Sequence, residues 1–171
     1  MNTELQGNAV QNIHAPDVVA FEDLTLFTLT TQGSLAAKAK FGPLPSLPPA
    51  EVADRFLQKC YQHTQAYICI VDWVMLRQWH EDRERVCSAS AQDGLETMKH
   101  AYFLWMTYAI GAQLDPSSEL PCGVYYARAL QYLSAPLAHE DLTAVQALLM
   151  LAQYSFRASV CDAILNRHNF Y

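Results

Sequence analysis

The sequence predicts an all-α protein in which antiparallel helices follow an irregular N-terminal arm. From Pro48 onward, apolar residues recur at spacings of three and four, which is the period of an amphipathic helix. The connections between these apolar stripes are short, and short connections favour antiparallel neighbours. The chain has 171 residues, of which 51% are hydrophobic and 16% charged, so it can bury the core of one domain.

The chain changes character at residue 44. Residues 1–43 are predicted to be a flexible arm and linker, because the first 20 are polar and unpatterned. Within the arm, the threonine-rich stretch Phe21–Gln32 is either a short strand or an irregular packed segment. The prolines of "GPLPSLPP" then favour a linker, since each removes a hydrogen-bond donor and restricts its neighbour.

The first two predicted helices follow this linker. Pro48 and Pro49 suit a first helical turn. The next apolar run, "AYICIV" (66–71), is short enough to be extended, and Asp72 can cap the second helix, which carries Trp73, Leu76 and Trp79. The stripe of the first helix consists of Val52, Ala53, Phe56, Leu57, Cys60, Tyr61 and Thr64.

The third and fourth helices are marked by their ends. Asp93 stands three residues before Glu96, in the spacing of a capping box, and Gly111 with "DPSS" is expected to end the third helix. The fourth helix is predicted over Pro121–Leu133, where "SAP" stops it.

The fifth helix, Leu142–Phe156, starts at Asp141 or Thr143 and is apolar on nearly all sides. A helix of that kind must be surrounded by protein, so we expect it to be the most buried helix. Replacing Leu148 or Leu149 by Ala should then cost about 2–5 kcal/mol.

Several polar and aromatic residues within the helices allow two interpretations. Gln146 can bond a neighbouring helix inside the core, or face a polar edge. Tyr125 and Tyr126 can line a ligand pocket, although aromatic residues at helical spacing more often belong to a core. His63 and His100 have no partner nearby in the sequence, which favours core or surface positions over catalysis.

Charge and cysteine content exclude several protein classes. The net charge is −6 and the 11 basic residues are scattered, so we expect no direct nucleic-acid contact. The five cysteines form no C-x-x-C pair, which favours small core residues in a reducing compartment over a zinc site or disulfide framework. No secretory signal or transmembrane-length segment is visible, so we expect an intracellular soluble protein without membrane contact.

The titratable clusters have structural explanations. The densest, "HEDRER" (80–85), is interpreted as a solvated helix end with local ion pairs, although a metal or acid–base site is the alternative. "HED" (139–141) is interpreted as a helix N-terminus, where acidic residues favour the macrodipole. We therefore predict no catalytic, cofactor-binding or metal-ligating residues, no cofactor and no enzyme activity.

The order of the helical motifs resembles a known family. "GVYYARALQYL" and "LTAVQALLMLAQY" resemble two helices in the middle homology region, the regulatory domain, of fungal zinc binuclear-cluster transcription factors. Upstream, "LPSLPPAEVADRFLQKC" and "FLWMTYAIGAQL" resemble the earlier helices of that region, so the resemblance covers residues 44–157. The best matches lie at Tyr125, Tyr126, Ala127, Arg128, Leu130, Leu142, Val145, Gln146, Ala147, Leu148, Leu149, Leu151, Ala152 and Tyr154.

The resemblance implies a nuclear transcription regulator with an all-α, solenoid-like regulatory domain fragment, in the setting of secondary-metabolite gene clusters. The six-cysteine zinc module, basic linker and coiled-coil segment of that family are not in this sequence. The chain is therefore expected to act through proteins of the transcription machinery, a full-length regulator or a small apolar ligand. The alternative is a stand-alone helical small-molecule-binding protein or enzyme of a biosynthetic pathway.

The last expectation concerns residues 158–171, a divergent C-terminal tail in which the helical pattern fails from Val160. Val160–Cys161 can be encoded as GTATGT, a common fungal start-of-intron signal. On that hypothesis the residues after Ser159 are translated intron, and a fuller regulatory domain lies downstream. The fifth helix would then lack neighbours and expose an apolar patch.

Overall fold

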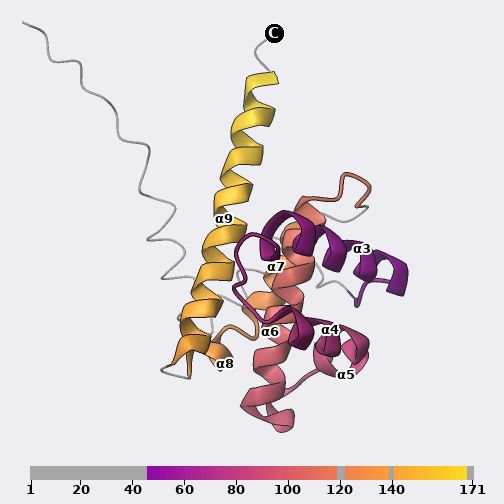
Figure 1. Cartoon of the computed structure of the whole chain (residues 1–171), viewed down its shortest axis with the longest axis vertical. Helices are drawn as coiled ribbons and strands as arrows, with labels where there is room; N and C mark the ends of the chain where they lie inside the picture. The colour runs from indigo at the N-terminus through magenta and orange to yellow at the C-terminus, as the bar shows by residue number, and fades with distance from the viewer. Residues whose placement is uncertain (1–45, 119–121, 139–140, 169–171) are drawn as a thin grey trace, which may run out of the picture.

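The computed structural model describes residues 46–118, 122–138 and 141–168, with side chains up to residue 157. This part of the chain is helical and contains no strand, so the all-α prediction is confirmed (Figure 1). No helix in it is long and apolar enough to cross a lipid bilayer. The predicted arm, including Phe21–Gln32, lies outside these residues. The elements in order are α3 (Ala50–Cys60), η1 (Tyr61–Gln65), α4 (Trp73–Glu81), α5 (Arg83–Cys87), η2 (Ala91–Asp93), α6 (Gly94–Gln113), α7 (Cys122–Leu130), α8 (Ser134–Leu137) and α9 (Leu142–His168).

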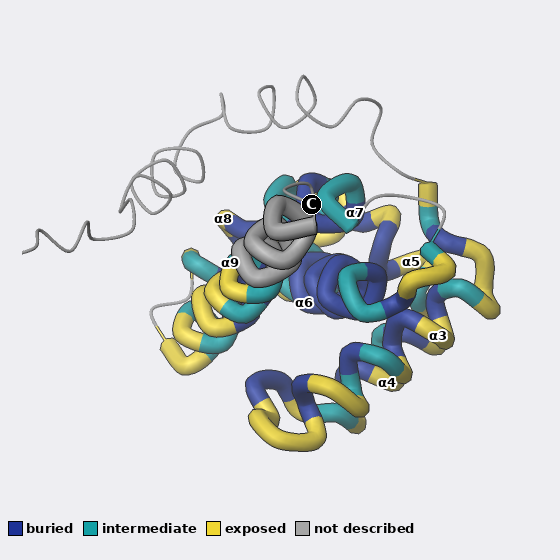
Figure 2. Tube along the Cα trace, turned by 90° about the horizontal axis from the view of Figure 1, so that it is seen from above, coloured by how far each residue is buried: buried dark blue, intermediate teal, exposed yellow. Residues whose placement is uncertain are grey.

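Helix α6 is the centre of the molecule. Every residue from Ala101 to Ala112 is buried, so the helix is enclosed on all sides over more than three turns. The other helices pack around it, and Figure 2 shows it as a dark blue coil between α7, α9 and the α3–α4 pair. The apolar run "AYFLWMTYAIGA" fits this position because no polar face has to be hydrated.

The prediction that Leu142–Phe156 is the most buried helix is therefore wrong. In α9 one face, formed by Ala147, Met150, Leu151 and Tyr154, is buried. The opposite face is exposed, and Leu148 and Leu149 retain 51% and 49% of their accessible surface. The physical reason is that α6 already occupies the central position, so α9 lies along the edge of the molecule (Figure 1).

Close contact between α3 and α6 depends on Gly111. The sequence placed this glycine at the end of the third helix, but it lies inside α6, which continues to Gln113. A Cβ atom at this position would lie 2.1 Å from the carbonyl oxygen of Phe56 in α3. Glycine is therefore needed here because it has no side chain, and not because it ends the helix.

Two predicted helix caps can be compared with the structure, and one of them is shifted. Asp72 caps α4 as expected, since its carboxylate accepts hydrogen bonds from the amides of Val74 at 2.7 Å and Met75 at 3.4 Å. The capping box lies one turn earlier than predicted. It joins Ser90 and Asp93 around η2, and the carboxylate of Asp93 accepts from the Ser90 amide at 2.7 Å.

The ends of the later helices also differ from the sequence patterns. The predicted fourth helix corresponds to α7, which ends at Leu130, three residues earlier than predicted. The sequence "SAP", expected to stop that helix, instead begins the short helix α8. Of the two predicted starts of α9, Asp141 is confirmed: it directly precedes the helix, and its carboxylate accepts a hydrogen bond from the Thr143 amide at 2.7 Å. Helix α9 then continues to His168, so the expectation that the helical pattern fails from Val160 is wrong.

The segment between α3 and α4 is bent, not extended as "AYICIV" allowed. Element η1 is one turn of π-helix, in which the Ala66 amide donates to the Tyr61 carbonyl at 2.9 Å. This turn directs Gln65 inward, where its Oε1 accepts from the Ile70 amide at 3.1 Å and its Nε2 contacts Met150 Sδ at 3.6 Å. Gln65 therefore fixes the bend and holds it against α9.

The described cysteines are free thiols. Cys60 and Cys87 are buried in the core, as predicted, and burial raises their pKa values to about 11 and about 12. Cys69 is exposed on the bend and is the exception to the prediction.

Candidate functional site

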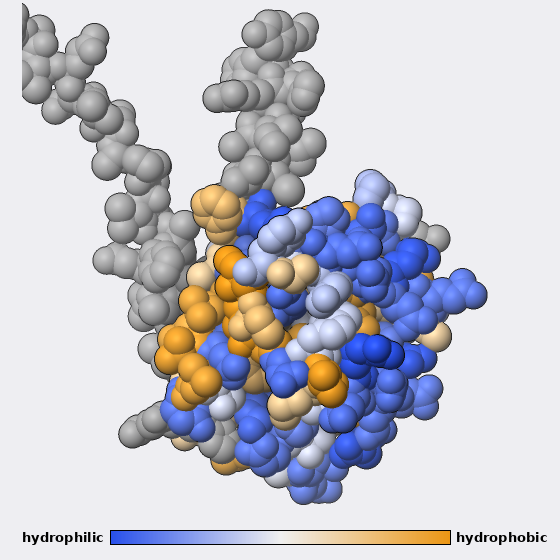
Figure 3. All heavy atoms as spheres, viewed as in Figure 1, coloured by the Kyte–Doolittle hydropathy of each residue, from blue (hydrophilic) through white to orange (hydrophobic). Residues whose placement is uncertain are grey.

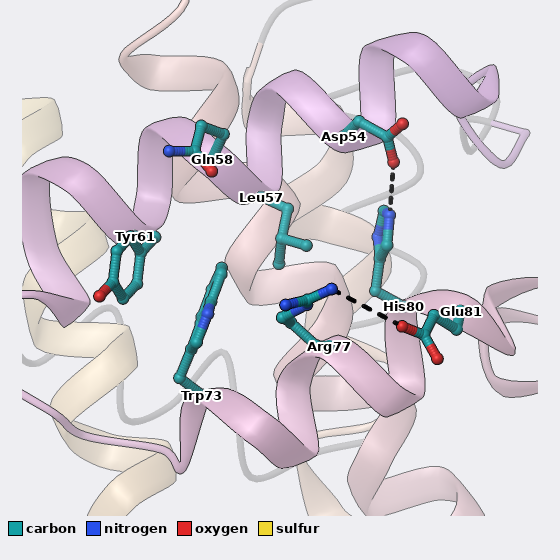
Figure 4. A pocket seen from close by; sticks show the side chains of 8 residues that line it. All are labelled: Asp54, Leu57, Gln58, Tyr61, Trp73, Arg77, His80 and Glu81. Atoms are coloured by element: carbon teal, nitrogen blue, oxygen red, sulfur yellow. Dashed lines mark hydrogen bonds and ion pairs between the residues drawn. The ribbon is translucent and has the colours of Figure 1, made fainter.

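The first candidate site is an open pocket of about 540 Å³ between α3 and α4 (Figure 4). Most of its lining side chains are polar. Its charged groups come from facing turns of the two helices, so they converge although they lie over 20 residues apart in the sequence. The lining residues are Asp54, Leu57, Gln58, Tyr61, Trp73, Arg77, His80 and Glu81.

His80 connects three helices at the wall of this pocket. Its Nε2 lies 2.7 Å from an Asp54 carboxylate oxygen in α3, and its Nδ1 lies 2.9 Å from the Tyr108 hydroxyl in α6. An ionised carboxylate only accepts, so Nε2 carries the proton that is donated to Asp54. Burial raises the pKa of Tyr108, which keeps this tyrosine in its hydroxyl form.

This arrangement limits what His80 can do chemically. Both ring nitrogens already have protein partners, and Tyr108 is itself buried in the core. A general base needs a nitrogen within hydrogen-bond reach of a substrate proton. The geometry is therefore that of a structural connection, in which His80 positions Asp54 at the pocket rim.

Four residues of the "HEDRER" cluster, Glu81, Asp82, Glu84 and Arg85, are exposed as predicted. Arg85 and Asp82 form an exposed ion pair at 2.5 Å, and Arg77 lies 3.9 Å from Glu81. The prediction is wrong for His80, which is buried, and holds only in part for Arg83, which is half-buried. Among the described residues, no group of three or more His, Cys, Asp or Glu side chains is arranged to hold a metal ion.

The opposite wall of the pocket is aromatic. The rings of Tyr61 and Trp73 lie with their centroids 4.3 Å apart at an interplanar angle of 33°. Arg77 and Asp54 place a cation and a carboxylate on either side of Leu57 (Figure 4). This combination suits a small polar molecule with a flat ring.

The two adjacent tyrosines belong to the core, which confirms one of the two interpretations. Tyr126 stacks on Tyr154 of α9, with centroids 4.1 Å apart and an interplanar angle of 2°. Tyr125 packs edge-on against Phe56 at 5.4 Å. These contacts join α7 to α9 and to α3.

The other polar residues singled out from the sequence have structural roles. His100 is half-buried and stacks on Trp79 with ring centroids 4.3 Å apart, and His63 is exposed. Gln146 is half-buried and donates to the Ile70 carbonyl at 2.7 Å, so it bonds the bend before α4 and not a neighbouring helix. His139 and Glu140 lie outside the described residues.

The second candidate site is the exposed side of α9. This surface, called the α9 apolar face below, contains no charged residue, and the 15-residue stretch Leu142–Phe156 contains none either. Figure 2 shows exposed positions along the outer side of α9, and Figure 3 shows apolar side chains gathered there at the left of the view. The face consists of Leu142, Val145, Leu148, Leu149, Ala152 and Phe156.

The inner side of α9 is held firmly, so the apolar face is presented on a fixed element. The Tyr102 hydroxyl in α6 donates to the Ala147 carbonyl at 2.8 Å, and the Arg157 guanidinium donates to the His63 carbonyl at 2.9 Å. Sequence reasoning expected an exposed apolar patch here only if the chain lacked a neighbouring helix. The spacing of the exposed residues, three and four apart along one side, is the signal that marks the face.

Comparison with protein-family models, with curated proteins and with solved structures finds no match for this chain. The assignment of function therefore depends on the residues and their geometry.

Proposed function

We propose that this chain is a regulatory module of the fungal zinc-cluster transcription regulator type, which acts through contacts with protein and not by catalysis. A nuclear location and an antiparallel, solenoid-like stacking of the helices belong to the same proposal. The observation that carries it is the α9 apolar face, because a contiguous apolar surface without charge is typical of the centre of a protein interface.

The link to transcription is supported by the residue pattern alone. The motifs that resemble the regulatory domain fall on α3, α6, α7 and the first half of α9, in the order expected for that region. The sequence has a net charge of −6, which favours an indirect role at the DNA over direct binding. A DNA-bound partner is expected to supply the sequence specificity.

The proposal is tested by fusing the whole chain to an unrelated DNA-binding domain and measuring transcription of a reporter gene in fungal cells. We expect the fusion to change reporter output and Leu149→Lys to abolish the change. Leu95→Lys is the matched control, because Leu95 is 52% exposed on α6, outside the α9 apolar face. A fusion with no effect on the reporter, at normal protein levels, would refute the link to transcription.

The pocket between α3 and α4 supports a second candidate function, the binding of a small molecule. Trp73 lines this pocket, so a ligand that stacks on the indole is expected to change its fluorescence. Flat aromatic carboxylates and amines are suitable probes, because Arg77 and Asp54 offer either charge. Saturable quenching that is lost in Trp73→Leu would favour this function, and a linear, unsaturated response would count against it.

A further inference from the structure

We propose that the α9 apolar face binds a second copy of this chain, with the two α9 helices antiparallel. The inference rests on the proposed function in one respect, namely that this face contacts protein. It adds that the partner is a second copy of the same chain. Two properties of the face carry it: the spacing of its residues and the distribution of charge at its ends.

The exposed residues follow the heptad pattern of a helix that packs against another helix. The spacing of three and four repeats twice along the stretch, and each of these positions is exposed. This pattern differs from the buried side of α9, which packs on α6, where Tyr102 bonds the Ala147 carbonyl, and on the bend, where Met150 contacts Gln65. The heptad positions are Leu142, Val145, Leu149, Ala152 and Phe156, and they form a seam of the coiled-coil type.

The seam is complementary to itself in the antiparallel direction. A two-fold axis midway between Leu149 and Ala152 sets each Leu149 opposite Ala152 of the second copy. The same axis sets each Val145 opposite Phe156. Small side chains therefore face large ones along the contact, which is how two helix surfaces interdigitate.

Charge favours the same orientation. Asp141 precedes the charge-free stretch and Arg157 follows it. Antiparallel helices bring Asp141, at the start of the charge-free stretch of one copy, near Arg157, at the end of that stretch in the other, and the helix dipoles then oppose. A parallel pair would bring like charges together at both ends.

The area is adequate for a dimer. The large side chains of the face keep about half to three quarters of their surface, from 49% at Leu149 to 73% at Phe156. Together they expose about 500 Å² of apolar surface, at the upper end of what ordinary monomers show. A standard interface buries about 800 Å² per partner, so the face provides more than half and polar neighbours along α9 can provide the remainder.

The test measures the mass of the purified full chain by sedimentation equilibrium from about 1 to about 100 µM, a range that detects micromolar affinities. We expect the wild-type chain to approach twice its 19.2 kDa mass, Leu149→Lys to stay near 19.2 kDa, and the control Leu95→Lys to dimerise normally. Phe156→Lys replaces Leu149→Lys if circular dichroism shows that the latter does not fold.

A mixing experiment tests the orientation. Leu149→Lys and Ala152→Glu should each prevent dimerisation alone. When the two variants are mixed, the antiparallel register sets the new lysine opposite the new glutamate and leaves one native pair intact, so dimers should return. A parallel register sets neither new charge opposite the other, and a mixture without dimers would refute the antiparallel arrangement.

The remaining outcomes overturn the inference in distinguishable ways. A wild-type chain that is monomeric at about 100 µM shows that a second copy does not occupy the face. If reporter output nevertheless falls with Leu149→Lys, the face binds a different protein and the proposed function stands. If neither mass nor reporter output responds, both proposals fail. A dimer that persists in Leu149→Lys and Phe156→Lys places the interface elsewhere.

Discussion

Replacing Gly111 by Ala provides the sharpest test of the central packing. At an unconstrained position inside a helix, this change stabilises a protein by about 1 kcal/mol, because alanine has the higher helix propensity. Here the new Cβ would lie 2.1 Å from the carbonyl oxygen of Phe56 and 2.6 Å from its Cα. Ordinary contacts begin near 3.4 Å, and backbone atoms cannot swing aside, so α3 must move away from α6.

The expected net effect is a loss of about 2 kcal/mol. Overpacking a filled core costs about 1–3 kcal/mol or more, and the propensity gain offsets only part of it. For a chain of this size the midpoint of thermal unfolding should fall by about 4–8 °C. Because Asp54 is carried by α3, its 2.7 Å contact with His80 should also lengthen.

The assay is urea unfolding followed by circular dichroism, with Gly111→Val as a second variant. The larger side chain should cost more, while an unchanged slope of free energy against urea would show that the unfolded state is unaffected. A rise in stability of about 1 kcal/mol for Gly111→Ala would show that α3 and α6 are not in close contact at this point.

Three further predictions follow from burial and charge. Leu149→Ala should cost about 1 kcal/mol or less in dilute, monomeric protein, whereas the adjacent and fully buried Met150→Ala should cost about 2–5 kcal/mol, and equal losses in urea unfolding would contradict the burial of α9. Hydrogen bonds to the Asp115 carboxylate, of which the one from the Ser117 hydroxyl has the largest effect, lower its pKa below the ordinary 3.8. Asp115 therefore stabilises the fold above about pH 4 and loses this effect as the pH falls through its folded pKa, so the stability difference between wild type and Asp115→Asn should shrink on acidification from pH 7 to pH 3 and not grow. In the folded protein at pH 8, iodoacetamide should modify Cys69 and leave Cys60 unmodified, because burial raises the Cys60 pKa to about 11; mass spectrometry of the peptides decides this.

Sequence patterns predicted the helices more reliably than their surroundings. Caps and apolar stripes are local, and the start of α4 after Asp72 follows directly from the preference of an aspartate for the free amides of a first turn. The pattern missed the bend at Gln65, because the bend is held by hydrogen bonds from the Ile70 and Val71 amides to that side chain and by its contact with Met150, 85 positions away.

The candidate sites show the same limit. His80 was interpreted as part of a solvated charged turn, because all six residues in "HEDRER" are polar and four of them are indeed exposed. The sequence does not reveal Asp54 and Tyr108 as the neighbours of His80. The spacing of the α9 apolar face was present in the sequence. It was interpreted as the surface of an all-round buried helix, since periodicity reports apolar positions and not what covers them.

The sequence by itself determined that the described part of this protein is helical and where most helices start, and it marked Leu142–Phe156 as apolar on nearly every side. The run at residues 101–112, in α6, is similarly apolar. Only the tertiary structure decided which of the two becomes the core. Helix α6 has Gly111, which lets α3 approach to backbone contact, and its neighbours enclose residues 101–112 completely. Helix α9 lies at the edge, where a single layer of neighbours covers one face. Hydrophobic burial is non-directional, so the composition sets how much apolar surface can be buried, and the packing of the other helices decides which apolar surface is buried.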